Sequence, residues 1–282
     1  MPTRTDTRAW RLLCSGHADA FLNMAVDEAI LLAVAEGAAA PTLRLYGWRP
    51  PGVSLGYFQP LAREIDAEAC RRHGYDIVRR PTGGRAILHD DEVTYSVCVR
   101  QADVPGGDRI LASYRWISRG IEAAFASLGL GTTFGGNGSR DGGKALPAAC
   151  FAKAARADMV VDGRKIVGSA QTRRRGAILQ HGSIPLSLDF ETIADVMPGR
   201  PEARTPAAAA LAGAATSVSA ALGRPVTFDE LCESLVRGFE AALSVRLVER
   251  DLSADERETA QRLRRDKYAT DAWNLSPGRK HP

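Results

Sequence analysis

The sequence lacks the cysteine pattern of a disulfide-rich or zinc-binding protein. Its 282 residues include only five cysteines, which stand singly and never in a Cys-x-x-Cys spacing. They are Cys14, Cys70, Cys98, Cys150 and Cys232. An odd number of isolated thiols argues against a disulfide framework and against a cysteine-ligated zinc site. We therefore expect no bound metal and a reducing, cytoplasmic environment.

Long apolar runs are missing as well. The most extended stretch of small apolar residues, 206–222, is rich in alanine and is interrupted by glycine, threonine and serine. This composition is too weakly hydrophobic to span a bilayer. The N-terminal sequence MPTRTDTRAW also has no apolar core of the kind that directs secretion. We expect no membrane segment and no secretion signal.

Aromatic residues and strong charge are scarce too. Aromatic side chains make up 6% of the chain, the net charge is +4, and basic residues cluster only briefly, at 173–175 and 262–265. A mild positive charge suits an acidic protein partner, whereas nucleic-acid-binding domains have stronger basic patches. We expect no nucleic-acid partner.

The residues that are present predict a folded α+β protein. Predicted strands cover 42–46, 53–58, 76–80, 93–99, 158–162, 165–171 and 177–184, and predicted helices cover 24–35, 62–72, 109–128 and 227–243. Asn23 is expected to cap the first helix, the strand at 93–99 to be half-buried, and Asp162-Gly163 to form a hairpin turn. No linker or repeat divides the chain. We therefore expect a single domain over 1–282, with a mixed or antiparallel sheet core flanked by helices (about 10–245) and a helical extension (about 250–275).

A glycine turn with basic flanks lies in RRPTGGRAILHD, at 79–90. Because Gly83 and Gly84 lack Cβ atoms, backbone N–H groups there can approach a ligand closely. Three cations suited to phosphate or carboxylate surround the turn, namely Arg79, Arg80 and Arg85. His89 follows and could face the same cavity. The simpler interpretation is a tight turn with solvated arginines. The sequence is neither a P-loop nor a dinucleotide fingerprint, because the required lysine and third glycine are missing.

Two later strands carry unusual polar residues. Lys165 begins one strand, where a solvated edge residue is the simpler interpretation, but the small residues 168–170 leave room for a ligand. His181 and Gly182 interrupt the next strand, and a histidine that bonds to a backbone carbonyl is the structural alternative.

Cys150 follows a glycine-rich loop at 135–147, where its side chain can face a cleft. The alternative is a buried, structural cysteine. An ammonium beside a thiol lowers the thiol pKa and stabilises the thiolate. If Cys150 and Lys165 meet across the predicted turn, the pair is suited to covalent acyl transfer.

Several stretches resemble the lipoate–protein ligase/octanoyltransferase family, which is related to biotin ligases. The matching stretches are NMAVDE (23–28), WRPPGVSLGYFQ (48–59), RRPTGGRAILHDDEVTYSV (79–97), GRKIVGSAQTRRRGAILQHGSI (163–184) and YATDAWN (268–274). The resemblance implies a biotin/lipoate protein ligase-like catalytic domain.

The resemblance also implies a branch of the family. Cys150 precedes the lysine strand, as in octanoyltransferases of the ligase-like branch. ATP-dependent ligases typically have a third glycine where this chain has Arg85, and the chain has no room for their accessory domain. A further transferase type has its cysteine after the His-Gly motif, where this chain has Ser183.

The implied reaction moves an octanoyl group from acyl carrier protein to Cys150, with Lys165 holding the thiolate. A lysine of a lipoyl domain or of the glycine-cleavage H protein then accepts the group, with no ATP and no cofactor. The implied substrate-binding residues are Arg80, Thr82, Gly83, Gly84, His89, Gly168, Ser169, Ala170, His181 and Gly182. The small members of this set would wall an apolar tunnel.

Three other functions stay open. An ATP-dependent lipoate ligase would need free lipoate, ATP and magnesium, and not Cys150. An amidotransferase would move octanoyl between two lipoyl-bearing proteins through a cysteine. A non-catalytic subunit would bind acyl carrier protein or a lipoyl domain without turnover.

Overall fold

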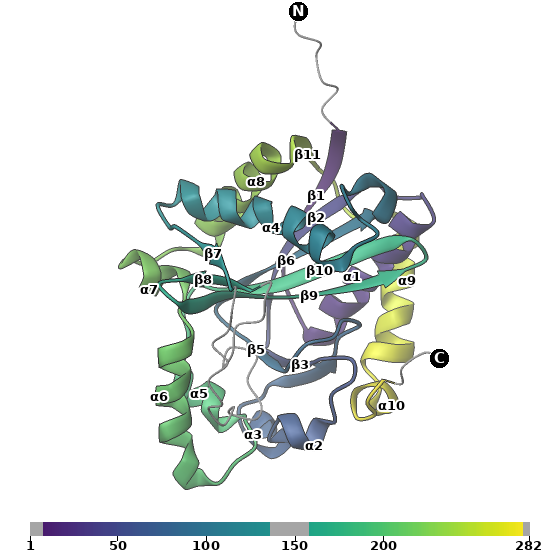
Figure 1. Cartoon of the computed structure of the whole chain (residues 1–282). Helices are drawn as coiled ribbons and strands as arrows, with labels where there is room; N and C mark the ends of the chain where they lie inside the picture. The colour runs from purple at the N-terminus through teal and green to yellow at the C-terminus, as the bar shows by residue number, and fades with distance from the viewer. Residues whose placement is uncertain (1–7, 136–157, 279–282) are drawn as a thin grey trace, which may run out of the picture.

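The computed structural model describes residues 8–135 and 158–278 (Figure 1). Cys150, and the glycine-rich loop beyond Gly135, lie outside the described residues. The predicted meeting of Cys150 with Lys165 therefore remains a prediction.

An eight-stranded mixed sheet forms the centre of the fold. In the order β11-β1-β2-β6-β10-β9-β8-β7, its strands are Val245–Glu249, Arg8–Ala18, Thr42–Trp48, Glu92–Arg100, Ala177–Pro185, Arg164–Arg174, Met159–Val161 and Thr133–Phe134. β1 pairs in parallel with β2 and β11, and the remaining pairs are antiparallel. The predicted mixed α+β core is confirmed.

Two tight turns connect β8, β9 and β10, and the first is the hairpin turn predicted at Asp162-Gly163. Asp162 and Gly163 both have positive φ, which a two-residue hairpin turn requires. Arg175 and Gly176 likewise both have positive φ at the second turn. The turns place β9 between its neighbours, with Gly168 opposite Ser183 of β10.

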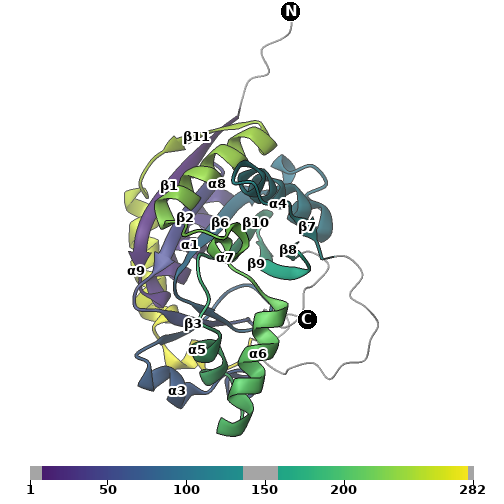
Figure 2. The same cartoon turned by 90° about the vertical axis from the view of Figure 1, so that its left-hand side faces the viewer.

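A second sheet of three strands lies below the first (Figures 1 and 2). Its order is β4-β3-β5, with bounds Asp76–Arg79, Gly52–Leu55 and Ile87–His89. The continuous helix predicted over 62–72 is wrong: Ile65 is extended, and the segment forms α2 (Leu61–Glu64) and α3 (Ala67–Arg72). Asp66 caps the second of these helices by accepting hydrogen bonds from Glu68 N and Ala69 N.

Helices cover both faces of the large sheet. α4 (Ile110–Ser127) and α8 (Phe228–Leu243) pack on one face, and α1 (Ala20–Ala35) and α9 (Ala254–Leu263) pack on the other (Figure 1). β6 is consequently buried on both sides, with Val97 facing α4 and α8 and Cys98 facing α1. The prediction of a half-buried strand is wrong. The strand alternates Val with the small residues Thr, Ser and Cys, and the face that carries these small residues is buried as well.

The first helix begins earlier than predicted. Asp19 caps α1 by accepting a hydrogen bond from Leu22 N at 2.8 Å. Asn23, the predicted cap, is buried inside the helix, where its amide donates to Gly47 O at 3.0 Å. The acidic cap suits the positive end of the helix dipole.

The C-terminal extension is bonded to the core. It comprises α9, the π-helical turn η4 (Arg264–Tyr268) and α10 (Asp271–Asn274). The ammonium of Lys267 pairs with the buried carboxylate of Glu28 in α1 at 2.5 Å. Asn274 Oδ1 accepts a hydrogen bond from Arg79 N at 2.9 Å. These bonds hold the extension against α1 and β4.

The remaining helical elements are short. They are η1 (Gln101–Asp103), α5 (Phe190–Asp195), η3 (Pro201–Ala203), α6 (Arg204–Ala214) and α7 (Val218–Leu222). The alanine-rich stretch therefore forms two helices. Within residues 8–135 and 158–278, no helix has the length and apolar character needed to cross a membrane.

Candidate active site

A cavity lies between the two sheets, where β9 and β10 face β3 and β5. Its empty space is about 380 Å³ with the open solvent at its mouth included, and its lining is mainly apolar. Of the predicted binding residues, it is lined by Arg80, Gly84, His89, Gly168, Ser169, Ala170, His181 and Gly182. Gly84 is exposed, which marks an opening of the cavity to solvent. The structure thus brings most of the predicted binding residues to one largely apolar space.

Three predicted residues lie outside this lining. Thr82 is fully buried behind it and bonds to His181. Gly83 lines a neighbouring pocket with about 1270 Å³ of empty space, together with Tyr57 and Trp273. Lys165 lies further along β9.

Glycine at position 182 permits the close approach of β9 and β10. A Cβ atom there would lie 2.5 Å from Ser169 Oγ and 2.8 Å from Gly168 O. Ser169 is itself fixed, because its hydroxyl accepts a hydrogen bond from Tyr95 OH at 2.8 Å. A side chain at position 182 would displace the backbone of β9 at Gly168 and the Ser169 side chain in the cavity wall.

The arginines of the glycine turn have a different role from the predicted one. Arg79 donates to the carbonyl oxygens of Gly56 and Gln59 at 2.9 and 2.7 Å, and to Asn274 O at 2.9 Å. Its guanidinium is saturated by backbone, so the prediction that Arg79 offers donors to a ligand is wrong. Arg85 is exposed, as the simpler interpretation expects.

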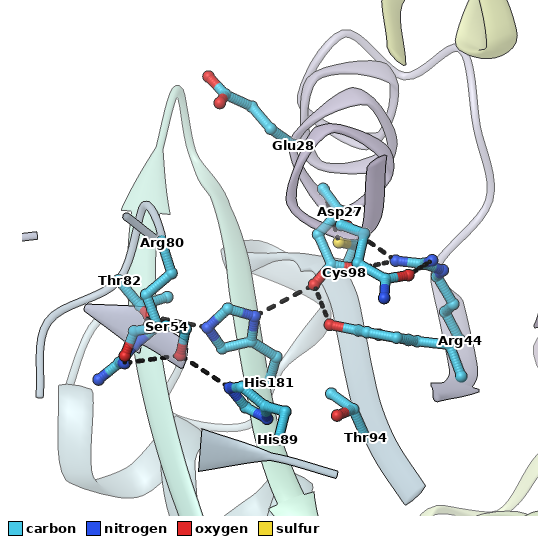
Figure 3. Close-up of polar contacts among 12 residues, drawn as sticks. Asp27, Glu28, Arg44, Ser54, Arg80, Thr82, His89, Thr94, Cys98 and His181 are labelled. Carbon is cyan, nitrogen blue, oxygen red and sulfur yellow. Dashed lines mark hydrogen bonds and ion pairs between the residues drawn. The ribbon is translucent and has the colours of Figure 1, made fainter. Parts of the chain in front are cut away.

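Arg80 organises the wall of the cavity. Its guanidinium donates to Ser54 O and Arg85 O at 2.9 and 2.7 Å, which ties β3 to the glycine turn. It also donates to two hydroxyl groups, Ser54 Oγ at 3.0 Å and Thr82 Oγ1 at 3.2 Å. Each hydroxyl contacts a histidine (Figure 3), and each histidine in turn contacts a carboxylate.

The first of these chains runs from Thr82 to α1. Thr82 Oγ1 lies 2.7 Å from His181 Nε2, and His181 Nδ1 lies 3.1 Å from Asp27 Oδ2. An ionised carboxylate only accepts hydrogen bonds, so Nδ1 carries the proton of the neutral ring and Nε2 accepts from Thr82. We name this chain the Thr82 relay.

The second chain runs from Ser54 to β6. Ser54 Oγ lies 2.7 Å from His89 Nε2, and His89 Nδ1 lies 2.8 Å from Glu92 Oε1. Glu92 also accepts hydrogen bonds from Thr94 and from Ser183, so both of its oxygens are acceptors. His89 Nδ1 therefore donates to Glu92, as His181 Nδ1 donates to Asp27. We name this chain the Ser54 relay.

Asp27 is a fully buried carboxylate at the start of this network. It pairs with Arg44 at 2.7 Å and accepts a hydrogen bond from Tyr46 OH at 3.0 Å. Burial alone would raise the pKa of Asp27, but the Arg44 guanidinium and the bond from His181 hold that pKa below its usual value. The carboxylate is therefore ionised and fixes the orientation of the His181 ring.

Sequence reasoning missed Asp27, Ser54 and Glu92 as members of the site. Ser54 is a polar residue in the apolar strand GVSL, which is the signal that drew attention to His181. Asp27 lies in a matching stretch, but nothing in its local sequence indicates a partner 154 residues away.

Lys165 is buried in an ion pair. Its Nζ lies 2.8 Å from Asp158 Oδ2, and the two side chains are 2% and 6% exposed. The interpretation of Lys165 as a solvated edge residue is wrong. Buried charges need such partners, so the pair fixes the ammonium at the start of β9.

The described cysteines are poor nucleophiles at neutral pH. Burial raises the pKa of Cys70 to about 11 and that of Cys232 to about 12. Burial raises the pKa of Cys98 well above its usual value, and desolvation together with Glu249 raises the pKa of Cys14. All four thiols therefore stay protonated, which favours Cys150 as the candidate nucleophile.

The buried His181 predicts a dependence of stability on pH. Burial lowers its pKa, although the bond to Asp27 opposes this shift. As pH falls below about 6.5, the unfolded chain binds a proton that the folded chain does not, so stability present above that pH is lost. We expect urea unfolding to show a fall of up to about 1.4 kcal/mol per pH unit from this group, absent in His181→Gln. An identical pH dependence in both proteins would contradict the assignment.

The chain matches known proteins over nearly its whole length. Residues 19–240 match the lipoyl protein ligase A/B catalytic domain. The chain is 45% identical over 273 residues to octanoyltransferase LipM of Symbiobacterium thermophilum, covering 94% of this chain and 98% of that protein. It is 38% identical over 270 residues to octanoyltransferase LipM of Bacillus subtilis, covering 94% and 97%.

Solved structures share the fold. A bipartite lipoate protein ligase from Thermoplasma acidophilum superposes with a TM-score of 0.80 at 26% identity, covering 97% of this chain and 99% of that chain. A lipoate-protein ligase A bound with ATP gives a TM-score of 0.77 at 26% identity, covering 95% and 98%. The predicted family is confirmed: the chain belongs to the lipoyl protein ligase A/B catalytic domain family.

Proposed function

We propose that this protein is an octanoyltransferase of lipoate biosynthesis. The observation that carries the proposal is the near full-length similarity to octanoyltransferases at 38 to 45% identity. The ligase structures are more distant, at 26% identity. The largely apolar cavity supports the proposal, because an alkyl chain gains free energy from burial in such a space.

In the proposed first half-reaction, the Cys150 thiolate attacks the octanoyl thioester of acyl carrier protein. The octanoyl chain would occupy the cavity between the sheets, against Gly168 and Ala170. The ammonium of Lys165, held by Asp158, would stabilise the thiolate and the developing oxyanion. The carrier thiol leaves with a proton, and Cys150 carries the octanoyl group.

In the proposed second half-reaction, the ε-amine of an acceptor lysine attacks the acyl-enzyme. The acceptor is a lipoyl domain or the glycine-cleavage H protein. The amide forms, Cys150 is released as a thiol, and no ATP is consumed because a thioester is already an activated acyl donor. We also propose that residues 1–282 act as one catalytic unit in a reducing, cytoplasmic environment, since the nucleophile must remain a free thiol.

Donor choice tests the proposal. Purified protein and a lipoyl domain are incubated with octanoyl carrier protein, or with octanoate, ATP and magnesium. We expect octanoylation of the acceptor lysine from the carrier without ATP, measured by intact mass. Transfer only from the free acid with ATP would overturn the proposal and identify a ligase.

The amidotransferase alternative is tested by competition. An octanoylated H protein and octanoyl carrier protein with distinct isotope labels are mixed with one acceptor. The proposal expects the carrier label on the acceptor. Label only from the H protein would identify an amidotransferase, and binding without transfer from either donor would identify a non-catalytic subunit.

A further inference from the structure

The two relays have the same wiring but different surroundings. In each, Arg80 donates to a hydroxyl and the hydroxyl contacts a histidine Nε2 at 2.7 Å (Figure 3), while Nδ1 of the same ring faces a carboxylate. Ser54 lines the cavity between the sheets, and Thr82 does not. Of the two hydroxyl residues, only Ser54 therefore stands in the cavity wall, where it is 1% exposed before any molecule binds.

The Ser54 relay has the parts of an activated serine. The nucleophile and its base are within hydrogen-bond distance, and Glu92 orients the base from the other side at 2.8 Å. Thr94 and Ser183 hold Glu92 in turn. The His89 ring is stacked on Trp48 with centroids 3.9 Å apart, so it cannot rotate out of line. Such a chain of contacts defines a general base by geometry.

Arg80 adds a cation beside the serine oxygen. Its Nη1 lies 3.0 Å from Ser54 Oγ and donates to it, which leaves the serine proton for His89 Nε2. The same positive charge stabilises negative charge that develops on or next to that oxygen. Ser54, His89 and Arg80 all line the cavity.

We propose that Ser54 is a second acyl-accepting nucleophile, which hydrolyses small activated acyl esters and thioesters that enter the cavity. This activity does not depend on Cys150 or on the proposed transfer reaction. Its substrates are acyl groups short enough for the carbonyl carbon to reach Ser54 Oγ.

Ser54 Oγ forms a bond to the carbonyl carbon, and its proton passes to His89 Nε2, while Glu92 stabilises the charged ring. The bond from carbon to the alcohol or thiol breaks, and the leaving group takes the proton from His89. Water then attacks the acyl-serine, His89 accepts and returns its proton, and the free acid leaves with Ser54 restored.

Covalent labelling tests the proposal without any change at Ser54. The Cys150→Ala protein is treated with a small alkyl fluorophosphonate, which loses fluoride when a serine oxygen attacks phosphorus. We expect one adduct, mapped by peptide mass spectrometry to Ser54 and not to Thr82 or Ser183. No adduct, or an adduct only elsewhere, would overturn the proposal.

Hydrolysis of p-nitrophenyl butyrate gives the second readout. In the Cys150→Ala background, Ser54→Ala and Glu92→Gln are expected to lower kcat/KM at least about tenfold. The matched control is Ser187→Ala, a serine that bonds to Asp91 outside the cavity, and it keeps the rate. Unchanged hydrolysis in folded Ser54→Ala protein would contradict the inference. If that variant does not fold, the labelling result decides.

Discussion

Replacing Cys150 with alanine is expected to lower octanoyl transfer from carrier protein by on the order of 10³-fold or more. Covalent catalysis divides one difficult step into two easier ones, and without the thiol neither step has its nucleophile. The rate is measured as octanoylated acceptor formed per minute at saturating donor.

The control for this variant is another cysteine. Cys14 is exposed but has a raised pKa, and Cys14→Ala is expected to keep the full rate. Cys150→Ser places a weaker nucleophile at the same position, and this variant is expected to lose most of the transfer rate. Near-normal transfer by either Cys150 variant would remove the cysteine from the mechanism and favour the ligase alternative.

Replacing Lys165 with methionine is expected to lower transfer by about 10² to 10³-fold, the usual cost of losing a fixed electrostatic donor. The same change leaves the buried carboxylate of Asp158 without its ammonium partner. Breaking a buried pair in this way costs about 3–5 kcal/mol of stability. Lys165→Met is therefore expected to be both inactive and less stable in urea unfolding.

A double variant separates the two effects. Adding Asp158→Asn removes the unpaired charge, so Lys165→Met/Asp158→Asn is expected to recover most of the lost stability. It is not expected to recover activity, because no ammonium remains at the start of β9. Recovery of both would mean that Lys165 acts only through folding, and would contradict its proposed role.

The elements that the sequence predicted well are those set by local chemistry. Asp162-Gly163 specifies a hairpin, and the helix predicted at 227–243 is α8, which Thr227 caps. Local sequence patterns did not predict the secondary structure of segments whose conformation depends on tertiary contacts. The edge strand β11 has no strong pattern of its own and was not predicted. The segment around Ile65 has none either and was predicted as helix.

The same difference between local sequence patterns and tertiary contacts applies to the candidate site. The glycine turn, the small residues of β9 and His181 were identified because each is locally unusual, and the structure places most of them on one cavity. The burial of Lys165 and the backbone-bound Arg79 were not predictable from spacing. Each depends on a partner brought in by the fold: Asp158 across the β8–β9 hairpin, and Asn274 from the C-terminal extension.

The central claim is a covalent octanoyl group on Cys150. The most direct test is the intact mass of the protein after mixing with octanoyl carrier protein, without acceptor and without ATP. We expect a gain of one octanoyl group, mapped to Cys150 and removed when a lipoyl domain is added. No gain in mass on the native chain, together with continued transfer to the acceptor, would contradict it.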